Sequence, residues 1–257
     1  MAASIYAMEA MTYTTAGLID RGLEDYMLET AMLKVYTTEA LWAVVNDAFQ
    51  IYGGAAYFTD QPLERMLRDA RINQIDEGAN DVLRSFIALV GMRGPGTQLR
   101  EVWEALHHPW TELGKVWRYG LQRADAAICM PEVPVNSASL QGYALELSCL
   151  IKLFSNAVRR SLIKHGEAIF DYQYVQARMS EVAMELFAYA CVLSRWGSEL
   201  EEQDESDRTW RAGHAAGAYA LKASTRRVRQ LLAELRDNDD QAMTEAANAI
   251  LSLWDAG

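Results

Sequence analysis

The chain has 257 residues, 51% of them hydrophobic, which is enough for one large domain or two modest ones with apolar cores. Its 24 basic and 35 acidic residues give a net charge of −11, which argues against binding to a nucleic acid backbone. No apolar run reaches the ~20 residues of a membrane span. The 3 cysteines and 4 histidines show no metal-ligand spacing, so we expect no metal site.

An all-α fold is predicted, because the chain contains only 5 prolines and 16 glycines and is rich in alanine and leucine. Residues 1–19 have helical periodicity, and Asp20-Arg-Gly22 ends that helix. Residues 24 to about 52 form one amphipathic helix of roughly 40 Å. Helices of this length generally belong to a bundle that covers them along their length.

The segment from Gln50 to Arg84 interrupts this helical pattern. Gly53 and Gly54 stop the long helix and, without a Cβ atom, let a ligand or another backbone approach closely. Pro62 suits the first turn of a short helix, where its missing N–H is not needed. Glu77 then precedes a third helix, so its carboxylate lies at the positive end of that helix. On spacing alone, an acid in this position is usually only a helix cap.

A second helical region follows Gly94-Pro-Gly96. Residues 98–124 are aromatic-rich and predicted to be helical, with a break at Pro109, and their tryptophans suit either packing on the bundle or contact with a membrane interface. A linker spans Pro131 to Pro134. Helical patterns then cover residues 139–164, 168–198, 207–235 and 239–254, which together predict a second antiparallel bundle.

Three motifs resemble the C-terminal domain of the acyl-CoA dehydrogenases. They are Gln50-Ile51-Tyr52-Gly53-Gly54, then Glu64-Arg-Met-Leu-Arg-Asp69, then Glu77-Gly78-Ala79-Asn80-Asp81 at the start of a helix. The Asn80-Asp81 ending and the long helical extension are similar to the very-long-chain branch. This resemblance implies three parts: the family's C-terminal helical domain over residues 1–96 without its first helix, an amphipathic linker over 97–136, and a C-terminal helical extension over 137–257.

The resemblance also implies chemistry, namely α,β-desaturation of a long-chain acyl-CoA in fatty acid β-oxidation with FAD as cofactor. Glu77 corresponds to the base that removes the α-proton, and Gly78 lies beside the thioester. Ala79, Asn80 and Asp81 face the flavin, while the five residues from Gln50 to Gly54 contact the adenine and pyrophosphate half of an FAD held largely by a neighbouring subunit. The family usually has threonine at the position of Ala79, so a hydroxyl contact to the cofactor is lost here.

The partners implied are electron-transferring flavoprotein, a second copy of the chain in a homodimer, and peripheral membrane contact. The N-terminal and β-domains of full-length members are absent from this sequence, so we expect another chain to supply them or the sequence to be a fragment. The expected location is the bacterial cytoplasm, or the mitochondrial matrix or inner-membrane face in a eukaryote. The alternative hypothesis is a noncatalytic helical interaction module derived from this family.

Overall fold

The computed structural model describes residues 1–107, 130–201 and 208–254, which contain helices and no strand. This confirms the all-α prediction. The α-helices are α1 (Ala2–Asp20), α2 (Met27–Tyr52), α3 (Pro62–Ile72), α4 (Asn80–His107), α6 (Gln141–His165), α7 (Gln173–Glu201), α8 (Arg208–Glu234) and α9 (Asp240–Trp254). The 3₁₀ helices are η1 (Gly53–Tyr57), η2 (Ala138–Leu140) and η3 (Gly166–Phe170).

Helix ends follow the glycine and proline signals of the sequence, with one exception. Gly53 caps α2 with a positive φ of 68°, and Pro62 is the first residue of α3. Helix α4, however, continues through Gly94-Pro95-Gly96 to His107, so the boundary expected at residue 96 lies inside a helix. A proline removes one helical hydrogen bond but does not by itself end a helix when the turns on both sides hold. The aromatic-rich stretch, for which packing on the bundle and membrane contact were both open, lies largely outside the described residues.

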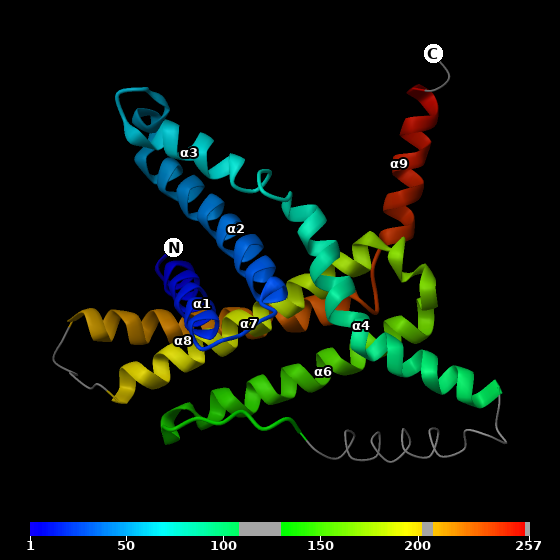
Figure 1. Ribbon diagram of the computed structural model, residues 1–257. Coiled ribbons are helices and arrows are strands. Elements are labelled where there is room, and N and C mark those ends of the chain that lie inside the picture. Colours follow the sequence, from blue (N-terminus) through cyan, green and yellow to red (C-terminus); the bar gives the residue numbers. More distant parts are fainter. Residues whose placement is uncertain (108–129, 202–207, 255–257) are drawn as a thin grey trace.

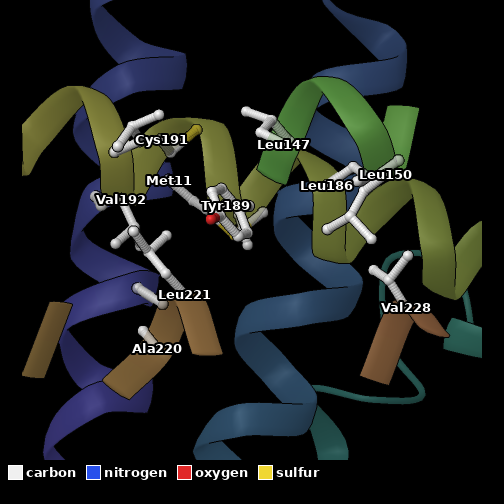
Figure 2. Close-up of a cluster of buried hydrophobic side chains, with 14 of the residues drawn as sticks. Met11, Leu147, Leu150, Leu186, Tyr189, Cys191, Val192, Ala220, Leu221 and Val228 are labelled. Carbon is white, nitrogen blue, oxygen red and sulfur yellow. The ribbon is translucent and has the colours of Figure 1, made fainter. Parts of the chain in front are cut away.

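Helix α7 is the centre of the molecule. It buries thirteen residues between Val175 and Trp196, and α1, α4, α6 and α8 all pack against it. The largest core cluster draws on α1, α6, α7 and α8, as the side chains of Met11, Leu150, Tyr189 and Leu221 illustrate (Figure 2). Because α1 comes from the first predicted bundle and α6 to α8 from the second, the two bundles share one core.

Helices α2 and α3 form a hairpin that projects from this core, and α3 leads back toward the start of α4 (Figure 1). A smaller cluster of Ala31, Met32, Val35, Ile87 and Met184 joins the first half of α2 to α4 and α7. This packing fixes the N-terminal end of α4 beside the middle of α2. Within the described ranges, the structure has no helix that combines the length and the apolarity needed to cross a membrane.

Helix α9 extends away from the bundle, and its residues from Gln241 to Leu253 are exposed (Figure 1). Its first residue, Asp240, accepts hydrogen bonds of 2.7 and 2.6 Å from the two terminal nitrogens of Arg178 on α7. This charged pair holds the base of α9, and the hydrogen bonding lowers the pKa of Asp240 below its usual 3.8.

We predict that Leu150→Ala lowers the free energy of unfolding by about 3 kcal/mol, because the fully buried side chain leaves a cavity among α6, α7 and α8. Leu145→Ala is the matched control, since Leu145 lies on the same helix and is 61% exposed, and it should cost less than about 0.5 kcal/mol. Urea unfolding followed by circular dichroism measures both. Equal losses for the two variants would contradict this placement of the core.

The Asp240–Arg178 pair should make the attachment of the first turn of α9 depend on pH. Because the pKa of Asp240 is lower in the folded protein than in the unfolded chain, its contribution is complete above the unfolded value and is lost as the pH falls through the folded one. Amide hydrogen exchange in α9, corrected for intrinsic rates, should therefore rise on acidification below about pH 3.8.

The variant Asp240→Asn should show the faster α9 exchange already at pH 6 and little further change on acidification. Asp239→Asn is the control, because Asp239 is exposed and asparagine still caps a helix. Acid-induced exchange that is the same in the wild type and in Asp240→Asn would rule out this pair as its cause.

Candidate functional site

The turn before α4 has an unusual backbone. Glu77 has a φ of 50° and Gly78 a φ of 97°, and Glu77 is the one non-glycine residue with a positive φ among those the structure describes. Glycine adopts this conformation at no steric cost, whereas a residue with a side chain is strained by about 1–3 kcal/mol. Such strain persists only where the surroundings enforce it, and it is concentrated at functional sites.

Lys34, in the first half of α2, supplies hydrogen bonds that hold this turn. Its Nζ donates to the Gly78 carbonyl at 2.7 Å and to Asn80 Oδ1 at 2.8 Å. Asn80 is only 5% exposed, and its Nδ2 donates to Thr38 Oγ1 at 3.0 Å and to Glu39 Oε1 at 3.2 Å. The turn is thus attached to one face of α2 over more than a helical turn.

Glu77 itself is exposed, and its backbone N–H donates to Asp76 Oδ1 at 3.0 Å. The side chain of Asp81 in the first turn of α4 is also almost fully exposed. The carboxylates of Asp76, Glu77 and Asp81 therefore all lie near the start of α4, where the helix dipole favours negative charge. Burial lowers the pKa of Lys34, while the charges of Asp76 and Glu77 oppose that shift.

An open groove of about 580 Å³ runs between α1 and α2 and extends to Asn73, just after α3. Met8, Tyr13, Leu33 and Leu41 supply apolar walls, and Lys34 and Asn73 lie where the groove meets the segment before Glu77. Lys34 therefore has a place both in the groove and in the restraint on the turn. Within the described ranges, no group of three or more His, Cys, Asp or Glu residues could hold a metal ion.

The glycine pair lies at the other end of the hairpin (Figure 1). Nineteen residues of α2 separate Lys34 from Gly53, which corresponds to roughly 28 Å of helix. A Cβ atom at Gly53 or Gly54 would meet nothing within 4 Å, and Ile51 and Tyr52 are 73% and 56% exposed. The structure thus brings together Glu77, Gly78 and Asn80 but places the segment from Gln50 to Gly54 apart from them.

Polar residues that the sequence motifs do not include extend the site into the core. Arg84 of α4 pairs with Glu39 at 2.6 Å and with Asp81 at 3.5 Å, and it lies 3.8 Å from Glu181 of α7. Glu181 also forms a short ion pair with Arg227 of α8. Lys34 and Thr38 also lie outside the motifs, and one sequence signal could have found them: they are spaced four apart in a predicted helix, so they share one face.

Two family models match the chain. The acyl-CoA dehydrogenase C-terminal domain matches residues 1–91, and the C-terminal domain described as ACAD9/ACADV matches residues 138–253. The mouse very long-chain specific acyl-CoA dehydrogenase, a mitochondrial protein, is 32% identical over 249 residues, which are 93% of this chain and 36% of the relative. The human counterpart is 34% identical over 208 residues, covering 77% of this chain and 31% of the relative.

A probable acyl-CoA dehydrogenase of Bacillus subtilis is 25% identical over 222 residues, covering 79% of this chain and 35% of the relative. The fold is also that of a solved acyl-CoA dehydrogenase complexed with FAD from Bacillus anthracis, with a TM-score of 0.69 and 21% identity over 96% of this chain and 43% of that one. The chain thus spans about a third of the length of these curated relatives. The two matched domains in order, and the similarity over most of the chain, show that the chain belongs to the acyl-CoA dehydrogenase family.

Proposed function

We propose that this chain forms the C-terminal part of an FAD-dependent acyl-CoA dehydrogenase that desaturates long-chain acyl-CoA in fatty acid β-oxidation, with Glu77 as the catalytic base. The observation that carries the proposal is the left-handed backbone of Glu77 at the start of α4. A mere cap would gain nothing from a conformation that costs about 1–3 kcal/mol, whereas an aimed carboxylate would. The substrate class is inferred from the very-long-chain relatives.

Proton removal beside a thioester needs a base at close range and donors at the carbonyl oxygen, because the α-hydrogen is only weakly acidic. Glu77 would accept that proton on its carboxylate, and its backbone N–H would support the thioester oxygen. In the structure that N–H donates to Asp76. Substrate binding must therefore displace the Asp76 carboxylate, and this exchange of hydrogen-bond partners is part of the proposal.

FAD fits the exposed glycine segment, since the backbone of Gly53 and Gly54 is open to a close approach by a dinucleotide. Gln50, Ile51 and Tyr52 would flank its adenine and pyrophosphate half. At the other site, Gly78 would lie beside the thioester, and Ala79, Asn80 and Asp81 would face the flavin. The Asn80 side-chain amide bonds to α2, and its backbone N–H donates to the Gln74 carbonyl. When bound, FAD supplies the acceptor for the β-hydride.

Because roughly 28 Å of α2 separates these two segments, we infer that they serve two different FAD molecules in a homodimer. Exposed apolar side chains at the hairpin tip, including Tyr57 at 77% and Phe58 at 65%, suit such a subunit interface. Electron-transferring flavoprotein as electron acceptor and peripheral membrane contact follow from the family resemblance alone.

A noncatalytic helical interaction module is the second candidate, and the exposure of Glu77 and of the hairpin tip favours it. Flavin absorbance separates the two functions. The complete protein that contains this chain should be yellow and should oxidise palmitoyl-CoA with an artificial acceptor if the first proposal holds. A colourless and inactive protein would favour the module.

We predict that Glu77→Gln reduces kcat by about 10²–10⁴-fold without loss of bound flavin, because the amide retains the shape of the side chain but cannot accept the proton. Glu24→Gln is the matched control: Glu24 is an exposed acid in the loop before α2, and its substitution should leave kcat unchanged. Steady-state assays with palmitoyl-CoA measure both. Full activity of Glu77→Gln would eliminate Glu77 as the base.

Relief of the backbone strain gives an independent prediction on stability. Glu77→Gly should unfold with a free energy roughly 1 kcal/mol higher than Glu77→Gln, because glycine adopts a φ of 50° without steric cost. Both variants lack the base, so a difference in stability reports on the backbone alone. A less stable glycine variant would show that the turn is not strained.

A further inference from the structure

We propose that Lys34 is a positioning residue for Glu77, holding the left-handed turn through its hydrogen bonds to Gly78 and Asn80. This inference rests on the proposed function of Glu77. Lys34 lies outside the three sequence motifs, and its role is to fix the direction in which the Glu77 carboxylate points.

The first argument is that Lys34 is the restraint the turn needs. Residues 76–79 form one short loop with a strained residue in it. Among the described residues, Lys34 is the one side chain from another element that hydrogen-bonds this loop. The backbone hydrogen bond from the Asn80 N–H to the Gln74 carbonyl at 3.0 Å closes the loop, but it does not fix the orientation of the loop relative to α2.

The second argument is geometric. The two acceptors of Lys34 lie on either side of Ala79, one in the loop and one at the first residue of α4. One ammonium group therefore holds the loop and the helix together, and rotation of the Gly78–Ala79 peptide, which carries the Gly78 carbonyl, would lengthen the bond to the loop. The Asn80 amide is itself fixed by Thr38 and Glu39, so the assembly is rigid on the α2 side.

The third argument is electrostatic. Lys34 is near enough to Asp76 and Glu77 for both carboxylates to favour its charged form. A cation at this point also offsets the repulsion among the acids gathered at the start of α4. A neutral side chain of similar length would lose both hydrogen bonds and this compensation, while its methylene groups would still pack against α2.

The test compares Lys34→Met, Lys34→Arg and the control Lys222→Met, an exposed lysine on α8, in the complete protein. Amide exchange at residues 76–80 should rise at least 10-fold in Lys34→Met and stay at the wild-type rate in Lys222→Met. Exchange in the α7 core should not change in either variant. The same rise should occur in the Glu77→Gln background, where catalysis is already lost.

In the assay, kcat of Lys34→Met should fall by about 10²-fold, as a misplaced catalytic group implies. KM should change less than 3-fold, and Lys34→Arg should recover part of kcat because it keeps the charge and two donors. An active wild type in which Lys34→Met leaves either the exchange or kcat unchanged overturns the role of Lys34 alone. An inactive wild type overturns the proposed function, and the role of Lys34 with it, whatever the exchange shows.

Discussion

The burial of α7 is the constraint on which the rest of the structure depends. A helix with apolar residues on nearly every side has to be covered on every side, and α1, α4, α6 and α8 do so. Two of these covering helices belong to the first half of the sequence and two to the second. The extension after residue 137 is therefore part of the same folding unit as the helices that carry the site, because neither half can bury its apolar surface without the other.

Polar groups also connect the Glu77 turn, through α7, to the second half of the chain. The path runs from Lys34 and Asn80 to Glu39, then through Arg84 to Glu181 on α7 and Arg227 on α8. Charged groups at such partly buried positions are tolerated because each has an opposite charge nearby. Glu185 follows the same rule: burial raises its pKa, while a hydrogen bond of 2.5 Å from Ser224 and the positive charge of Arg227 oppose that shift. A shift of α7 or α8 would therefore reach the start of α4.

The sequence was sufficient to predict most of the helices but not the contacts between them. Local signals act within a turn or two, so the end of α2 at Gly53 and the start of α3 at Pro62 were predictable. At Gly94-Pro95-Gly96 the local signals predicted a boundary, yet α4 continues through them, because one proline removes only one helical hydrogen bond. Glu77 was found by resemblance and not by periodicity. The bond from Lys34 to Gly78 joins residues 44 apart, and hydrophobic patterns report which face is buried, not which polar groups meet across it.

The geometry of the hairpin limits how an active site can form. Lys34 holds the Glu77 turn against the first half of α2, and the glycine pair lies roughly 28 Å away at the end of the same helix. A rigid helix of this kind cannot bend to bring Glu77 and Gly53 onto one flavin. Contacts to a single dinucleotide by both segments therefore require two copies of the hairpin, each offering a different end. Under the proposed function, the strained turn and the open glycines would have complementary roles: one end would aim a carboxylate, and the other would remain clear for the cofactor of a neighbouring subunit.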